Sequence, residues 1–185
     1  MYKFAPALPI ESTGLSSHKS IVFSCARPGY SDRAVRKWLK FIDRQNIEQI
    51  CCLLTDHQMD RCATNLLDTY HQKFGKDRVC WVPIRDFHLC ELSILTDQIL
   101  PFLDTAEQLD RKVVIHCSGG IGRTGHILAA WLVYKYQYSN REAISTVIKM
   151  GRNPYEAALF GVFRGKNIIS GIQELNLLLD CCRSI

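Results

Sequence analysis

The chain has 185 residues, of which 47% are hydrophobic, and its formal net charge at pH 7 is +5. This length and composition predict one compact domain, residues 1–185, that buries its own core without disulfide or metal support. The small, dispersed positive charge is compatible with an anionic ligand. It is too weak to predict a nucleic-acid partner.

The amino terminus and the cysteines indicate where in the cell the protein is expected. Residues 1–18 contain neither a basic segment nor the apolar segment of a secretion signal, and we expect an irregular extension there. No apolar stretch approaches the length of a membrane-spanning helix. Nine cysteines are scattered through apolar runs without paired spacing, which favours free thiols in a reducing compartment. The sequence therefore predicts a soluble cytoplasmic protein with no membrane partner, and it leaves the oligomeric state open.

The order of apolar patterns predicts the fold class. Buried strands are predicted from apolar, β-branched runs at residues 20–24, 47–54, 78–82 and 112–115. Helices are predicted from apolar spacing at residues 32–45, 66–74, 91–109, 127–136, 139–150 and 168–179. This alternation favours a single α/β domain with a central, mostly parallel sheet of about four to five strands flanked by helices. Ligands of such sheets bind beyond the carboxyl ends of the strands.

A glycine-rich segment, HCSGGIGRTG at residues 116–125, joins a predicted strand to a predicted helix. Its glycines allow the backbone to turn several N–H groups inward, and the helix that begins near Arg123 adds the positive end of its dipole. Together these features predict a cradle for a phosphate group. The predicted phosphate-binding residues are Ser118, Gly119, Gly120, Ile121, Gly122 and Arg123.

Three side chains of this segment carry the predicted chemistry. Cys117 lies at the bottom of the cradle, where inward N–H groups favour its thiolate and make it a nucleophile. Arg123 can donate paired hydrogen bonds to two phosphoryl oxygens, which a lysine cannot do. Thr124 can donate its hydroxyl to the sulfur and help the thiolate leave during hydrolysis of a phosphocysteine intermediate. We expect His116 to shape the loop by hydrogen bonding rather than to act as an acid or base.

These residues resemble the signature of a known family. His116, Cys117, Gly120, Arg123 and Thr124 match the H-C-x-x-G-x-x-R-[ST] pattern of cysteine-based protein tyrosine phosphatases, for which chance agreement at a given site is on the order of one in a few million. The short chain is similar to the compact dual-specificity branch, whereas the residues inside the motif are closer to tyrosine-specific members. The resemblance implies a protein tyrosine phosphatase-like fold and hydrolysis of protein phosphotyrosine, with phosphoserine and phosphothreonine left open. We expect no cofactor, and no metal either, because Cys52, His57 and Cys62 lack the close ligand pairs of a metal site.

The resemblance also implies a general-acid aspartate on a loop before the motif, and Asp86 is the candidate. The alternative is that Asp86 only caps a turn. Arg27 follows the first predicted strand and is a candidate for substrate contact, with an exposed loop cation as the alternative. Asn153 or Glu156 could contact the substrate or hold water, and the alternative is a helix start at Pro154.

Other functions share parts of this pattern. The segment also satisfies the G-x-G-x-x-G pattern of dinucleotide-binding folds, but no strand is predicted after the helix, and Cys117 and Arg123 are then unexplained. An RNA 5′-triphosphatase, a phosphoinositide phosphatase and a phosphoprotein-binding pseudophosphatase remain alternatives. The lysines that some phosphoinositide enzymes place inside the motif are absent at residues 118, 119 and 121. We therefore predict a phosphorylated protein as the substrate.

Overall fold

The computed structural model describes residues 2, 4–7, 20–158 and 167–185. Five strands form one sheet in the order β1-β2-β5-β3-β4. The strands are β1 (Ala5–Pro6), β2 (Val22–Ala26), β3 (Gln49–Cys52), β4 (Val79–Trp81) and β5 (Val113–Cys117). Strands β2, β5, β3 and β4 run parallel, whereas β1 pairs with β2 in the antiparallel direction. The predicted α/β fold with a mostly parallel sheet is confirmed.

The amino-terminal segment departs from the irregular extension that we expected. Ala5 pairs with Ser24, and Pro6 pairs with Phe23 at the edge of the sheet, where the missing N–H of a proline is tolerated. The backbone N–H of Ala7 continues the contact by donating to the carbonyl oxygen of Val22 at 2.7 Å. Residues 8–19 of the predicted extension lie outside the described residues.

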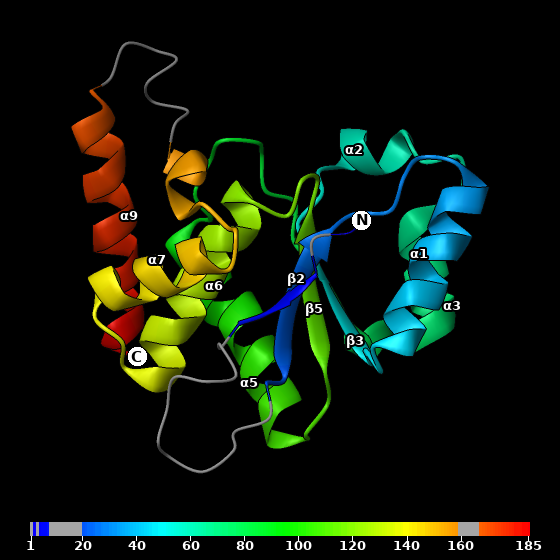
Figure 1. Ribbon diagram of the computed structural model, residues 1–185, viewed down its shortest axis with the longest axis horizontal. Helices are drawn as coiled ribbons and strands as arrows, with labels where there is room; N and C mark the ends of the chain where they lie inside the picture. Colours follow the sequence, from blue (N-terminus) through cyan, green and yellow to red (C-terminus); the bar gives the residue numbers. More distant parts are fainter. Residues whose placement is uncertain (1, 3, 8–19, 159–166) are drawn as a thin grey trace.

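Helices cover both faces of the sheet (Figure 1). One face is covered by α1 (Asp32–Arg44) and α3 (Leu66–Phe74). The other face is covered by α5 (Leu100–Gln108), α6 (Gly122–Tyr136), α7 (Asn140–Lys149) and α9 (Ile168–Arg183). With the exception of α5, these helices coincide with the predicted ones to within a few residues, and α6 begins next to Arg123, as expected.

The shorter helical segments were less predictable. The single helix expected at residues 91–109 consists of α4 (Leu92–Ile94), a π-helical segment at Leu95–Ile99 and α5 in direct succession. The five-residue helix α2 (Asp56–Asp60) follows β3 and was not predicted. Two 3₁₀ segments, at Lys76–Arg78 and Pro154–Ala158, precede β4 and follow α7. The segment at Pro154 matches the helix start that we weighed against a binding role for Asn153.

Strand β5 lies in the middle of the sheet and joins the two halves of the core. Its side chains alternate: Val113 and Ile115 pack with α5 and α6, while Val114 packs with Trp38 and Tyr70 on the opposite face. All five residues of β5 are buried. Because β5 leads directly into the cradle, the packing of both layers fixes where Cys117, its last residue, lies.

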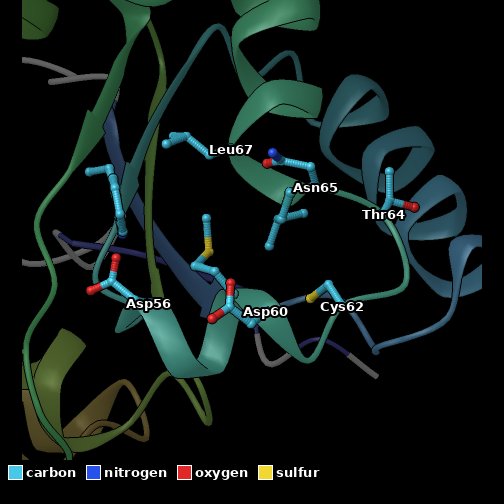
Figure 2. Close-up of a pocket in the computed structure, with 9 residues that line it drawn as sticks. Asp56, Asp60, Cys62, Thr64, Asn65 and Leu67 are labelled. Carbon is cyan, nitrogen blue, oxygen red and sulfur yellow. The ribbon is translucent and has the colours of Figure 1, made fainter.

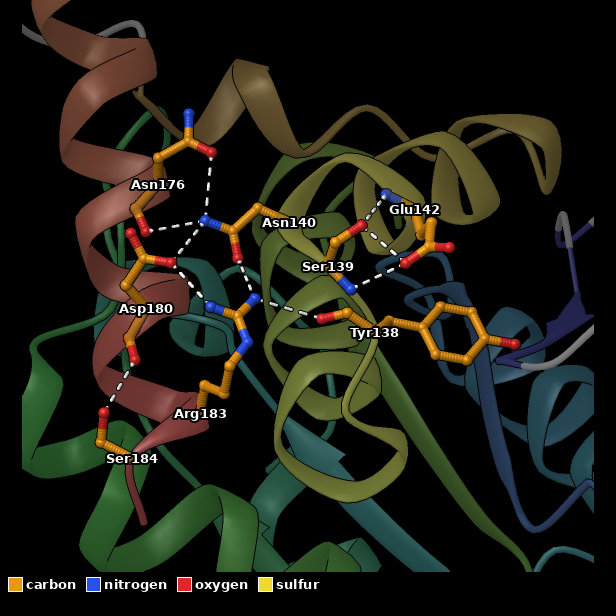
Figure 3. Close-up of polar contacts among 8 residues, drawn as sticks. All are labelled: Tyr138, Ser139, Asn140, Glu142, Asn176, Asp180, Arg183 and Ser184. Atoms are coloured by element: carbon orange, nitrogen blue, oxygen red, sulfur yellow. Dashed lines mark hydrogen bonds and ion pairs between the residues drawn. The ribbon is translucent and has the colours of Figure 1, made fainter.

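Polar contacts connect the helices that follow the motif (Figure 3). Ser139 and Glu142 form the predicted capping box, in which the backbone N–H of Ser139 donates to Glu142 Oε2 at 2.9 Å. Arg183 of α9 donates to Asn140 Oδ1 at 2.7 Å, and the amide of Asn140 donates to Asp180 Oδ1 at 2.9 Å. These contacts hold the end of α9 against the start of α7.

The nine cysteines are free thiols. None of the helices in the described segments is long and apolar enough to cross a membrane. The same segments contain no group of three or more His, Cys, Asp or Glu side chains that could hold a metal ion.

Candidate active site

The turn between β5 and α6 directs a backbone N–H group at the sulfur of Cys117. The backbone N–H of Gly120 donates to Cys117 Sγ at 3.2 Å. Gly120 has a φ of +69°, and a Cβ at this position would lie 2.4 Å from the carbonyl oxygen of Cys25. Both the backbone conformation and the space therefore require glycine. Cys117 itself is 2% exposed, so the thiol lies at the floor of the loop.

A cavity of about 240 Å³ opens above this thiol. Its lining residues are Asp86, Phe87, Cys117, Ser118, Gly119, Ile121, Gly122, Arg123 and Glu156. The structure thus brings Asp86, which lies 31 residues before Cys117 in the sequence, together with Cys117 and Arg123. A second cavity, of about 380 Å³, lies between α2, α3 and β4 and contains none of these three side chains (Figure 2).

Arg123 is 2% exposed, and its guanidinium spans the carboxyl ends of β3 and β4. Its Nη1 donates to the carbonyl oxygens of Ile84 at 2.8 Å and Leu53 at 3.1 Å. Its Nη2 pairs with Asp86 Oδ1 at 2.5 Å. Because the protein backbone occupies Nη1, the edge formed by Nε and Nη2 is the one suited to a phosphoryl group. A phosphoryl oxygen at Nη2 would displace Asp86.

Asp86 lies in a turn after β4, and its side chain is 50% exposed. Phe87, the next residue, has a φ of +62°. In the described residues, the carboxylate of Asp86 contacts Arg123 and also accepts a hydrogen bond from Gln58 Nε2 at 2.9 Å. The carboxylate therefore faces the cavity and the guanidinium, which favours the catalytic interpretation over that of a turn cap.

A sequence profile of the dual specificity phosphatase catalytic domain matches residues 45–158, more than half of the chain. The chain belongs to this family. Human dual specificity protein phosphatase 5 is 30% identical over 88 residues, which are 48% of this chain and 20% of that protein. The chain spans about a fifth of the length of the curated relatives that it matches first.

Solved structures share the dual specificity phosphatase fold of the chain. The active form of Tk-PTP superposes with a TM-score of 0.64 at 24% identity, covering 85% of this chain and 92% of that one. Kinase associated phosphatase with its catalytic cysteine replaced by serine also gives a TM-score of 0.64 at 24% identity, covering 79% of this chain and 86% of that one. These similarities extend the assignment of the fold beyond residues 45–158.

Two histidines of this region are buried, His116 within the family signature and His126 two residues after it. His116 Nε2 lies 3.1 Å from the hydroxyl of Tyr70, and its ring packs edge-on against Trp38. Burial lowers the pKa of His116 to about 3, so the ring is neutral. This position fits the predicted structural role and places the imidazole away from proton transfer at neutral pH.

His126 was not singled out by the sequence, yet it connects α6 to the Asp86 loop. Its Nε2 accepts a hydrogen bond from the backbone N–H of Cys90 at 3.0 Å, so the ring proton resides on Nδ1, which faces the carbonyl oxygen of Gly122 at 3.4 Å. Burial lowers the pKa of His126 to about 4. A protonated ring would direct a second N–H at the N–H of Cys90, and the contact would be lost.

The pKa of His126 predicts a loss of stability in mild acid. The imidazole ionises near pH 6.5 in the unfolded chain but only near pH 4 in the fold, so between these values the unfolded state binds more protons. The free energy of unfolding should therefore fall as the pH decreases below 6.5, by about 2 kcal/mol at pH 5 from this residue. The measurement is urea denaturation of wild type and His126→Gln at pH 7.5 and pH 5.

In that comparison His126→Gln keeps an acceptor for the N–H of Cys90 but does not titrate, so it should lose less stability between the two pH values than wild type. The exposed His57 supplies the matched control, because His57→Gln should retain the wild-type pH dependence. Equal pH dependence in wild type and His126→Gln would show that the imidazole does not ionise on unfolding.

Two further predicted site residues, Thr124 and Arg27, do not make their predicted contacts in this structure. Thr124 is buried, and its Oγ1 has no hydrogen-bond partner in the described part of the chain, so the predicted bond to the sulfur is not formed in this conformation. Arg27 lies beside the cradle: its backbone N–H donates to the carbonyl oxygen of Cys117 at 3.0 Å. Its guanidinium stacks on Tyr30, 3.5 Å from the ring centroid, and does not line the cavity.

The structure does not place Asn153 where it could contact the substrate, as we had considered. Its Oδ1 accepts a hydrogen bond from the backbone N–H of Tyr155 at 3.2 Å, which caps the turn leading into the 3₁₀ segment. Glu156, three residues later, lines the cavity instead. The capping requirement of the turn thus takes the Asn153 side chain away from the cradle.

Proposed function

We propose that this domain hydrolyses phosphotyrosine in proteins through a phosphocysteine intermediate on Cys117, with phosphoserine and phosphothreonine as further substrates. One observation carries the proposal: a single cavity is lined by the thiol of Cys117, the guanidinium of Arg123 and the carboxylate of Asp86. These are a nucleophile, an anion clamp and a proton donor, the three groups that a phosphate monoester requires.

In the first step the thiolate of Cys117 attacks phosphorus, and the bond from phosphorus to the tyrosine oxygen breaks. The protonated carboxyl group of Asp86 gives its proton to that oxygen, so tyrosine leaves as a neutral phenol. Arg123 and the N–H groups of the cradle stabilise the charge on the equatorial phosphoryl oxygens. The products are free tyrosine side chain and phosphocysteine.

In the second step water attacks the phosphocysteine, and the sulfur–phosphorus bond breaks. The carboxylate of Asp86 now takes a proton from the water, which restores the acid for the next cycle. The hydroxyl of Thr124 would rotate toward Cys117 Sγ and donate to the departing thiolate. Inorganic phosphate leaves, and no cofactor or metal is needed to balance the reaction.

The lining of the cavity favours an aryl phosphate over polyanionic substrates. Among the described residues around it, Arg123 is the single cation, and two carboxylates, Asp86 and Glu156, stand near it. Phe87, which is 44% exposed, and Ile121 provide apolar surface for a phenol ring. An inositol polyphosphate or an RNA triphosphate would bring several further negative charges against these carboxylates.

A substrate panel tests this proposal. We expect the highest kcat/KM for phosphotyrosine peptides, a lower value for phosphothreonine peptides of the same sequence, and little or no release of phosphate from inositol phosphates or RNA 5′-triphosphates. A preference for either polyanion would overturn the assignment of substrate. Binding of phosphopeptides without any turnover would instead identify a pseudophosphatase.

Replacing Asp86 by asparagine tests the proton donor. The wild-type pH profile of kcat/KM should be bell-shaped with an optimum on the acid side of neutrality. The rate rises as the substrate phosphate ionises near pH 6, and it falls as Asp86 loses the proton that it must donate. Asp86→Asn should flatten the falling limb and lower kcat for phenyl phosphates with poor leaving groups by about 10²–10⁴-fold. Substrates with good leaving groups should lose less.

Asp56 provides the matched control for this experiment, since its carboxylate lines the cavity between α2 and α3 rather than the cradle. Asp56→Asn should keep the wild-type profile. A falling limb that persists unchanged in Asp86→Asn, together with wild-type rates on phosphotyrosine peptide, would assign the acid to another residue.

A further inference from the structure

Gln58 contacts both charged groups of the candidate site. Its Oε1 accepts a hydrogen bond from Arg123 Nη1 at 2.8 Å, and its Nε2 donates to Asp86 Oδ2 at 2.9 Å. Asp86 Oδ1 completes the ring of contacts by pairing with Arg123 Nη2 at 2.5 Å. Three side chains from α2, α6 and the loop after β4 are thereby joined in one closed cycle.

A side-chain amide is the group that can close this cycle. A guanidinium only donates hydrogen bonds, and a carboxylate only accepts them, so a side chain between the two must offer one acceptor and one donor. Gln58 offers both on one planar group. A glutamate at this position would keep the acceptor for Arg123 but would direct a carboxylate oxygen at Asp86.

The short helix α2 is held so that Gln58 faces the cradle. Met59 is buried, with its sulfur 3.9 Å from Cys52 Sγ of β3. The backbone N–H of Thr55 donates to Gln58 Oε1 at 3.3 Å, which fixes the side chain to the first turn. Asp56 and Asp60 instead line the second cavity (Figure 2). The packing of α2 thus separates Gln58 from its acidic neighbours.

We propose that Gln58 is a positioning residue that decides which oxygen of Asp86 carries the catalytic proton. In the structure both carboxylate oxygens face a donor, Oδ2 the amide of Gln58 and Oδ1 the Nη2 of Arg123. Once the guanidinium turns to a phosphoryl group, Oδ1 is the oxygen that can carry the proton of the neutral acid. When a phosphoryl oxygen takes Arg123 Nη2, Oδ1 is released beside the phosphoryl group while Oδ2 stays bound to Gln58. The inference rests on the proposed phosphatase function, in which Asp86 protonates the leaving group.

The test compares Gln58→Glu and Gln58→Ala with wild type on aryl phosphates whose leaving groups range from phenol to dinitrophenol. Gln58→Glu keeps the size and the acceptor for Arg123 but loses the donor to Asp86. We expect both variants to lose roughly tenfold to a hundredfold in kcat on the poor leaving groups, the value of one hydrogen bond to a charged group. On the good leaving groups, which need no proton, the loss should be severalfold smaller.

A double variant tests whether the effect of Gln58 depends on Asp86, as the proposal requires. Adding Gln58→Glu to Asp86→Asn should lower kcat on phenyl phosphate no further than Asp86→Asn alone. The exposed neighbour His57 supplies the control, and His57→Ala should match wild type on every substrate.

Equal losses on good and poor leaving groups, or additive losses in the double variant, would overturn the positioning role. Gln58 would then act by holding Arg123 or by stabilising the fold. So would a Gln58→Glu variant with the wild-type dependence on the leaving group. A wild-type protein that hydrolyses none of the aryl phosphates would contradict the proposed function itself, and the role of Gln58 with it.

Discussion

Replacement of Cys117 by serine is expected to abolish hydrolysis of p-nitrophenyl phosphate while inorganic phosphate still binds. The serine hydroxyl is a poor nucleophile at neutral pH, whereas the N–H groups of the cradle and the guanidinium of Arg123 do not depend on the sulfur. We expect the rate to fall by about 10⁴-fold or more, as for other essential nucleophiles. Steady-state kinetics measures the first effect, and the rise in melting temperature on addition of phosphate measures the second.

Cys181 gives the matched control for that substitution, because its thiol is exposed on α9 and lies outside the cavity lining. Cys181→Ser should keep the wild-type rate. Substantial turnover in Cys117→Ser would exclude this residue as the nucleophile. Loss of phosphate binding in the same variant would mean that the cradle keeps its shape only with the sulfur that the N–H of Gly120 contacts, and would contradict the expected phosphate binding.

Replacement of Arg123 by lysine is expected to lower kcat/KM by about 10²–10³-fold, the usual effect of removing a preorganised donor to a developing anion. A lysine has one point charge and cannot hold two phosphoryl oxygens side by side. The structure adds a second effect. Without Nη1, the buried carbonyl oxygens of Leu53 and Ile84 lose a donor, which should cost roughly 1–3 kcal/mol of unfolding free energy.

Kinetics and urea denaturation of the same variant separate these two effects. Arg85 is exposed on the same loop as Asp86, so Arg85→Lys should change neither activity nor stability. A kcat/KM for Arg123→Lys within a few fold of wild type would contradict the proposed bidentate contact. Unchanged stability would contradict the bridging role of Nη1 between β3 and β4.

The features that the sequence predicted well are those encoded over short distances along the chain. The apolar runs of β3 and β5 and the capping box at Ser139 depend on neighbouring residues, and each appears where it was predicted. The cradle is also local, since its glycines, its cysteine and the start of α6 are contiguous. The two residues of β1 were missed because the pattern of so short a strand is invisible without its partner, β2.

Residues whose contacts join distant parts of the chain were not predicted from the sequence, because no local pattern encodes those contacts. Gln58 lies 65 residues from Arg123, and His126 lies 36 residues from Cys90, in contacts that exist only once α2 and the Asp86 loop are packed. Helix α2 has five residues, too few to show a periodic pattern. Arg27 follows β2, but its side chain stacks on Tyr30, a contact that the sequence alone does not show.

The central claim is that the phosphoryl group passes through Cys117, and its most direct test is to trap that intermediate. Wild-type protein mixed with a phosphotyrosine peptide and quenched within the first turnover should carry one phosphoryl group, which mass spectrometry of proteolytic fragments should locate on the fragment with residues 116–123. The same experiment with Cys117→Ser should give an unmodified chain. A phosphoryl group on any other residue, or turnover of the peptide with no phosphorylated protein at any time before the steady state, would contradict the account.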